Sequence, residues 1–288
     1  MFFALKGDNF NGNKFAREAL SKGAQYAIVD EKQHALDDRF LLVDNVLQTM
    51  QDLACLHKKN TPAKVIAITG SNGKTTTKEL INRVLQKKYT THATEKNYNN
   101  HIGVPLTLLQ LDKSTDFAVV EMGANHIGEI RQLCTIADPD FGIITNIGKA
   151  HLEGFGSYEG VIQAKSELYD HVCQKKGKVF FNQDNPHLYD LLKERKCPTF
   201  SYGTDNRSDI QGTLIESFPF LKTRILNHQI ETNLPGVYNF ENIMASIAIG
   251  TYFQIDIRDI ADAIKRYVPD NNRSQIIHSE TNEIILDA

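Results

Sequence analysis

The sequence lacks any apolar run long enough to cross a bilayer, and its N-terminus, MFFALKGDNF, has no basic region followed by a long apolar stretch. We therefore expect neither a transmembrane helix nor a secretory signal. An excess of positive charge is also missing, because 32 Lys and Arg stand against 35 Asp and Glu, which gives a net charge of −3. This balance indicates neither a nucleic-acid partner nor a membrane-surface protein.

Cysteine pairs are also missing, since no C-x-x-C motif joins any of the four cysteines, Cys55, Cys134, Cys173 and Cys197. We expect all four to be reduced cytosolic thiols that fill the core. The composition that remains is that of a soluble globular protein, with 41% hydrophobic and 23% charged residues. A chain of 288 residues suffices for about two domains of roughly 150 residues each.

The most informative stretch is AKVIAITGSNGKTTTK, residues 63–78. An apolar strand-like run leads into a glycine turn, then Gly-Lys-Thr, then an amphipathic helix, which is the order that a phosphate-binding loop requires. Backbone N–H groups and the helix N-terminus would hold phosphates, Lys74 would reach the β- and γ-phosphates, and Thr75 would offer its hydroxyl to Mg²⁺. Ile68 stands where the common form of the motif has its first glycine. The alternative is an ordinary glycine turn. The predicted nucleotide-binding residues are Thr69, Gly70, Ser71, Asn72, Gly73, Lys74, Thr75 and Thr76.

Strands and helices alternate after this stretch, with strands expected at 64–69, 89–93, 117–121, 141–145 and 178–182 and helices at 74–87, 126–137, 158–173 and 186–194. Residues 199–233 are more β-like, and two further helices are expected within 234–267. The alternation predicts an α/β fold with a mostly parallel sheet flanked by helices. A smaller α/β unit precedes it, ending at a charged link that closes on Pro62. We expect domains at 1–60 and 61–285.

Three polar residues stand out near the expected strand ends or on a helix. Glu121 ends a buried strand and would be an Mg²⁺ ligand, or else a solvated acid. His151 follows the next strand in a glycine-rich loop and is either a site residue or an ordinary surface histidine. Lys165 lies on a helix, where lysine is usually solvated; if burial kept it neutral, it could capture CO₂ as a carbamate and ligate a metal.

Asn239 and Asn242 lie three residues apart at the start of a helix whose other face is apolar. Two amides on one exposed stripe would hydrogen-bond an adenine or a substrate. The alternative is that Asn239 caps the helix N-terminus.

Together these motifs resemble the Mur ligase family, the ATP-dependent amino-acid and peptide ligases of peptidoglycan precursor synthesis. The phosphate loop at 68–78 resembles that of the family, including the missing early glycine. Within the family, KNYNNHIGVPLTLL (96–109), EMGANHIGEI (121–130) and NIGKAHLEGFGS (146–157) look like the D-alanyl-D-alanine-adding type. The stretch FFALKGDNFNGNKFA (2–16) resembles the family's UDP-sugar-binding N-terminal domain.

The resemblance implies ATP as cofactor, with two Mg²⁺ sites. Thr75 and Glu121 match ligands of one metal, and His151 and a carbamylated Lys165 match ligands of the second. Asn239, with Asn242, matches the adenine side of the site, and Arg273 matches an arginine near the phosphates. The implied catalytic residues are Lys74, Lys165, His151 and Arg273. The implied residues for the acceptor substrate are Asn97, Asn99, Asn100 and His101.

The activity implied is an ATP-dependent amide ligase in the bacterial cytoplasm, a monomer, that joins D-Ala-D-Ala to UDP-MurNAc-tripeptide through an acyl phosphate. The family's N-terminal domain normally begins earlier, its members often have His where this chain has Tyr238, and residues 286–288 look like the start of its C-terminal domain. We therefore expect a chain truncated at both ends and inactive alone. The alternatives are an ATP-binding fragment without autonomous ligase activity, or a sibling Mur or folylpolyglutamate-type ligase with another amino-acid substrate.

Overall fold

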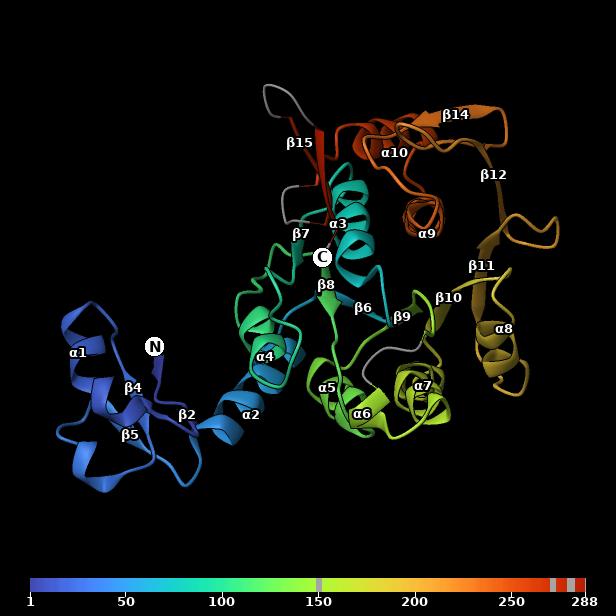
Figure 1. Ribbon diagram of the computed structural model, residues 1–288. Helices are drawn as coiled ribbons and strands as arrows, with labels where there is room; N and C mark the ends of the chain where they lie inside the picture. The colour runs from blue at the N-terminus through green and yellow to red at the C-terminus, as the bar shows by residue number, and fades with distance from the viewer. Residues whose placement is uncertain (149–151, 270–272, 279–282, 288) are drawn as a thin grey trace.

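The computed structural model describes residues 1–148, 152–269, 273–278 and 283–287. Among these residues, nine strands form the central sheet, in the order β14-β13-β12-β11-β10-β9-β6-β8-β7 (Figure 1). The sheet is parallel from β7 to β12, and β13 and β14 extend it antiparallel, which confirms the expected mostly parallel α/β architecture. The strands are β6 (Lys64–Thr69), β7 (Thr91–Ala93), β8 (Phe117–Glu121), β9 (Phe141–Ile144), β10 (Lys178–Asn182), β11 (Thr199–Gly203), β12 (Ile210–Glu216), β13 (Lys222–Ile225) and β14 (His228–Glu231).

Strand β6 lies in the middle of the sheet, between β8 and β9. Its residues Val65, Ile66, Ala67 and Ile68 are fully buried, as expected of a parallel strand with helices on both faces. Because side chains alternate along a strand, Val65 and Ala67 pack into one apolar core and Ile66 and Ile68 into the other. The carboxyl ends of β6, β8 and β9 therefore meet at one edge of the sheet.

Helices cover both faces of the sheet (Figure 1). One face carries α3 (Lys74–Leu85), α9 (Asn239–Tyr252) and α10 (Ile257–Lys265). The other carries α4 (Gly103–Leu108), α5 (Glu129–Ala137), α6 (Leu152–Phe155), α7 (Tyr158–Gln174) and α8 (Pro186–Lys193). The sequence pattern did not predict α4, a six-residue helix with Pro105 at its third position. Proline is tolerated there because an N–H in the first turn has no partner within the helix.

The N-terminal unit has its own small core around the parallel sheet β1-β4-β5, built from β1 (Phe2–Phe3), β4 (Ala27–Val29) and β5 (Phe40–Leu42). The unit also contains α1 (Ala16–Ser21) and the hairpin of β2 (Lys6–Gly7) and β3 (Phe10–Asn11). Helix α2 (Val46–Lys59) connects it to the central sheet (Figure 1). Val46 packs into the N-terminal core and Ala54 into the central one, so a single helix belongs to both.

Towards the end of the chain, β15 (Arg273–His278) pairs antiparallel with β16 (Glu283–Asp287). Across the described residues, no helix has both the length and the apolar character that a membrane crossing needs.

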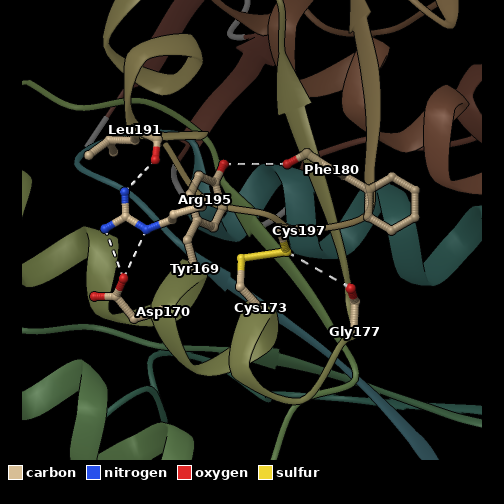
Figure 2. The surroundings of a disulfide bond; sticks show 8 residues. All are labelled: Tyr169, Asp170, Cys173, Gly177, Phe180, Leu191, Arg195 and Cys197. Carbon is tan, nitrogen blue, oxygen red and sulfur yellow. Dashed lines mark hydrogen bonds and ion pairs between the residues drawn. A yellow bond between two sulfur atoms is a disulfide. The ribbon is translucent and has the colours of Figure 1, made fainter. Parts of the chain in front are cut away.

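The expectation of four reduced cysteines is wrong for one pair. Cys173, in the last turn of α7, forms a disulfide with Cys197, which precedes β11 (Figure 2). The two residues are 24 positions apart, and β10 and α8 return the chain to the end of α7, so spacing alone did not indicate the pair. An ion pair between Arg195 and Asp170, 2.8 Å long, joins the same two segments. Cys55 and Cys134 are free thiols.

Candidate active site

The turn after β6 is closely packed, and two of its glycines have backbone angles that favour glycine. Gly70 has φ +145°, and a Cβ added there would lie 2.0 Å from the Thr145 hydroxyl oxygen. Gly73 has φ +75°, and a Cβ there would lie 2.4 Å from Oδ1 of Asn242. Both glycines therefore serve close approach as well as conformation. The turn leads directly into α3, as the motif predicts.

Hydrogen bonds join this loop to the segment after β9. The Asn72 N–H donates to Oδ1 of Asn146 at 3.0 Å, and the Thr145 hydroxyl donates to the Asn72 carbonyl at 2.5 Å. The Ser71 N–H donates to the Asn146 carbonyl at 3.0 Å, and the Gly148 N–H donates to the Ser71 hydroxyl at 2.8 Å. The loop thus has its shape before any phosphate binds, which lowers the entropy lost on binding.

The Lys74 ammonium folds back over the loop and donates to the carbonyls of Gly70 and Ser71, at 2.9 and 3.0 Å. Burial lowers the pKa of Lys74, the positive charge of Arg273 acts in the same direction, and Glu121 opposes both. Arg273, on β15, therefore lies close enough to Lys74 to affect its ionisation. A lysine at a glycine loop with an arginine close by suits a polyphosphate, whose oxygens accept stronger hydrogen bonds than carbonyls do.

Thr75 and Glu121 bring two hard oxygen donors together. The Thr75 hydroxyl donates to Oε2 of Glu121 at 2.9 Å, and the Asn99 amide donates to Oε1 at 2.8 Å. Adjacent ligands of an octahedral Mg²⁺, with bonds of ~2.0–2.1 Å, stand about 2.9 Å apart. The spacing and chemistry of this pair therefore fit Mg²⁺. Glu121 is only 1% exposed, so the alternative of a solvated acid is wrong.

A cavity of about 340 Å³ opens beside this pair. It brings together Lys74, Lys165 and three of the four residues predicted for the acceptor substrate, Asn99, Asn100 and His101. Asn97 is exposed and does not line the cavity. The remaining lining residues are Gly123, Ala124, Asn125, Glu129, Gln132 and Leu133. Lys74 of the predicted phosphate loop and three of the four predicted substrate residues thus face one space.

Lys165 does not resemble a solvated helix lysine, because it is 2% exposed. Burial lowers the pKa of its ammonium to about 8, the charge of Lys74 acts in the same direction, and Glu129 and Glu167 oppose them. Among the residues that the structure describes, none pairs with Nζ by a hydrogen bond or an ion pair, and Nζ lies 5.4 Å from the ring centre of Phe155. This is an environment that favours the neutral amine. His151 lies outside the described residues.

The expectation of an exposed amide stripe at Asn239 and Asn242 is wrong, because these residues are 0% and 5% exposed. The Asn242 amide donates to Oδ1 of Asn239 at 2.9 Å, and its Oδ1 accepts from the Thr77 hydroxyl at 3.0 Å. The N-cap of α9 is Tyr238, so Asn239 is not the cap either. These two polar residues face α3, because α9 packs against that helix, and Asn242 contacts the loop at Gly73.

Four buried or half-buried polar residues near the cavity were missed: Gln51, Lys78, Glu129 and Glu167. The Gln51 amide donates to the carbonyl of His101 at 2.9 Å, and Lys78 Nζ donates to the Thr94 carbonyl at 2.6 Å. The sequence held a signal for Lys78, which shares a helical face with apolar Ile81 and Leu85 at spacings of three and seven. A polar residue inside an apolar stripe is buried and needs a hydrogen-bond partner, so the pattern predicts a buried, hydrogen-bonded Lys78.

Residues 68–250 match the family model for the Mur ligase middle domain. The UDP-N-acetylmuramoyl-tripeptide--D-alanyl-D-alanine ligase of Bacillus subtilis is 35% identical over 100% of this chain, and the chain covers 64% of that enzyme. The chain thus spans less than two thirds of that relative's length.

Solved structures agree with the sequence comparison. A crystal structure of MurF from Acinetobacter baumannii superposes with a TM-score of 0.86 and 31% identity, over 99% of this chain and 63% of that one. MurF ligase from Thermotoga maritima, in complex with ADP, superposes with a TM-score of 0.82 and 28% identity, over 98% of this chain and 66% of that one.

Proposed function

Because the chain belongs to the Mur ligase family, we propose that it is the ATP-binding part of a ligase that joins D-alanyl-D-alanine to UDP-N-acetylmuramoyl-tripeptide. The names of its relatives support this substrate pair, and the ADP complex of the Thermotoga maritima enzyme supports an adenine nucleotide. The setting is peptidoglycan precursor synthesis in a bacterial cytoplasm, and the protein acts there as a monomer. Size-exclusion chromatography with light scattering tests the last point.

The observation that carries this proposal is the shared cavity. Lys74, at the phosphate loop, and Lys165, Asn99 and His101 line the same space of about 340 Å³. A substrate carboxylate bound there lies beside the γ-phosphate that the loop holds. Phosphoryl transfer depends mainly on such positioning and on neutralised charge.

The chain's own residues have defined tasks in this reaction. The loop N–H groups and Lys74 hold the phosphates, while Arg273 adds positive charge that offsets the repulsion between a carboxylate and a phosphate anion. The carboxylate oxygen attacks the γ-phosphorus, ADP leaves, and an acyl phosphate forms. The amine of D-Ala-D-Ala then displaces phosphate and forms the amide. We assign the base of the nucleotide to the side of the loop near Asn239 and Asn242, with Asn242 acting through Gly73.

We further propose two Mg²⁺ sites, one at Thr75 and Glu121 and a second at His151 and Lys165, the latter as its carbamate. Bound Mg²⁺ supplies positive charge for the phosphates. The lowered pKa of Lys165 supports the carbamate, since only the neutral amine attacks CO₂. Carbon-13 NMR in labelled bicarbonate tests it: a carbamate signal that is present in the protein and lost in Lys165→Met supports the assignment, and no such signal overturns it.

The sibling-ligase alternative is less favoured, because the relatives at 30–35% identity carry the D-alanyl-D-alanine name. A coupled phosphate-release assay on the full-length product of the gene decides between them. With ATP and UDP-MurNAc-tripeptide, we expect phosphate release with D-Ala-D-Ala and little with D-Glu, L-Lys, meso-diaminopimelate or D-Ala alone. Faster release with a single amino acid would contradict the assignment.

A further inference from the structure

Glu167 is a buried carboxylate to which the proposed chemistry gives no role. It lies on α7, two residues after Lys165, and is 2% exposed. Its Oε1 accepts a hydrogen bond from the Gly128 N–H at 2.8 Å, and its Oε2 accepts one from the Arg131 N–H at 2.9 Å. The Arg131 guanidinium lies further away, at 3.5 Å, and its side chain is 69% exposed. The strong partners of Glu167 are therefore backbone groups of another helix.

Those backbone groups are at the N-terminus of α5, which lacks a cap of its own. The N-cap residue is Gly128, with φ +95° and no side chain to accept a hydrogen bond. The first N–H groups of any α-helix have no partner within the helix. Glu167 accepts from two N–H groups at this end, and its charge suits the positive end of the helix dipole. Helix α5 is thus capped from α7.

The capped helix forms one wall of the cavity. Glu129, Gln132 and Leu133 of α5 line it, together with the phosphate loop residue Lys74. The Glu129 carboxylate accepts from the N–H groups of Asn125 and His126 at 2.7 and 3.2 Å, so the preceding loop is tied to the same helix. Where α5 lies therefore determines the shape of that wall.

We propose that Glu167 is a positioning residue that holds the α5 wall at a set distance from Lys165, and so sets the affinity of the cavity for the carboxylate substrate. It touches no substrate and acts only through α5. Among the described residues, Glu167 hydrogen-bonds to Gly128 and Arg131 and not to the nucleotide loop. This inference rests on the proposed function for its kinetic consequence, whereas its structural half, the capping of α5, does not.

The kinetic test uses the full-length product of the gene with Glu167→Ala and Glu167→Gln. In Glu167→Ala we expect KM for UDP-MurNAc-tripeptide to rise roughly five- to tenfold, a factor that matches the free energy of one lost helix cap. We expect KM for ATP to stay unchanged. Glutamine keeps one accepting oxygen but turns an N–H donor towards the other backbone N–H, so its KM rise falls between wild type and alanine. A loss of folded protein lowers the apparent kcat without changing KM. A rise in KM for the tripeptide therefore indicates a positioning role, whereas a fall in kcat alone indicates instability.

Arg131→Ala is the matched control, because it keeps the backbone N–H and removes only an exposed guanidinium; we expect wild-type kinetics. Unchanged KM for the tripeptide in Glu167→Gln, or an equal rise in KM for ATP, overturns the inference. If Glu167→Ala does not fold, Glu167→Gln decides. If the wild-type enzyme shows no ligase activity, the proposed function is wrong. Amide hydrogen exchange then tests whether Glu167 caps α5. Protection of residues 128–133 falls in Glu167→Gln if Glu167 caps α5, and unchanged protection refutes the capping.

Discussion

The Thr75 hydroxyl donates a hydrogen bond to Oε2 of Glu121 at 2.9 Å, although 46 residues separate the two in sequence. Strands β6 and β8 are parallel neighbours, and Ile68 of β6 is paired with Glu121 at the end of β8. The start of α3, which follows β6, therefore lies next to the end of β8. Parallel sheets place functional groups at the carboxyl ends of their strands. This pair is the clearest case of that rule in the protein.

Glu121→Gln tests the metal role of this pair. Glutamine preserves shape, and its oxygen can still accept from Thr75 while the Asn99 amide rotates to present its own oxygen to the new NH₂ group, but glutamine has no charge to offer Mg²⁺. We expect a near-native melting temperature and roughly a tenfold or greater rise in the Mg²⁺ concentration needed for half-maximal phosphate release. Glu95→Gln, an exposed acid on the loop after β7, is the control and should behave as wild type. An unchanged Mg²⁺ requirement in Glu121→Gln would remove Glu121 from the metal site.

Lys74→Ala tests the phosphate loop. Its partly buried ammonium bonds to the loop and lines the cavity, so its loss removes charge that the transferring phosphoryl group needs. We expect ADP formation in the full-length gene product to fall by roughly 10²–10³-fold or more. Lys64→Ala, which removes an exposed lysine at the start of β6, the end away from the loop, is the control. ATP turnover that survives in Lys74→Ala would reject the assignment.

Lys165→Met tests how burial affects the lysine. The folded-state pKa of about 8 lies below the ordinary value of 10.5, so the folded chain binds fewer protons between these pH values. The charged Lys165 ammonium therefore lowers the free energy of unfolding. This destabilisation is fully present below pH 8 and fades as pH rises towards 10.5. In CO₂-free buffer, Lys165→Met should therefore be more stable than wild type at pH 7, by on the order of 3 kcal/mol, and the gap should narrow towards pH 10.

Urea denaturation at several pH values measures that gap. Lys193→Met, an exposed lysine in the last turn of α8, should leave stability near wild type at each pH and serves as the control. The account of Lys165 is wrong if its methionine variant is less stable than wild type at pH 7.

The Cys173–Cys197 disulfide predicts two titratable thiols in denatured, unreduced protein and four after reduction. Closing a loop between residues 24 positions apart restricts the unfolded chain, and reduction should lower the free energy of unfolding by about 3 kcal/mol. Cys173→Ser should give the same loss without reductant. Four thiols in the unreduced, denatured chain would show that the bond does not form. Burial raises the pKa of the Cys134 thiol, so that group should react slowly until the chain unfolds.

The sequence predicted the central sheet well, because β6 and β8 are continuous apolar runs and the glycines that follow β6 mark its turn. Strand order also predicted that Glu121 would lie beside Lys74, since an α/β sheet brings such positions to one edge, and Glu121 does bond Thr75, the residue after Lys74. His151, predicted at the same edge, lies outside the described residues, and only the resemblance linked Lys165 to this site. The predicted helix at 126–137 began too early: Gly128 stands at φ +95° and α5 begins at Glu129.

The failures concern partners that lie far away in sequence. Asn239 and Asn242 have the spacing of an exposed stripe, but their environment depends on α3, which packs against their helix. Cys197 and Cys173 meet only because α8 turns the chain back. Glu167 was not singled out, because nothing local to it shows that it caps α5, which begins after a glycine without a capping side chain. Tertiary packing, not local propensity, decides each of these.

The most direct test is a crystal structure of the full-length gene product with a non-hydrolysable ATP analogue, Mg²⁺ and UDP-MurNAc-tripeptide. We predict that the triphosphate lies along residues 69–75, and that the terminal carboxylate of the tripeptide occupies the cavity between Lys74 and Lys165, about 3–3.5 Å from the γ-phosphorus. A nucleotide bound elsewhere, or a tripeptide carboxylate outside that cavity, would contradict the account.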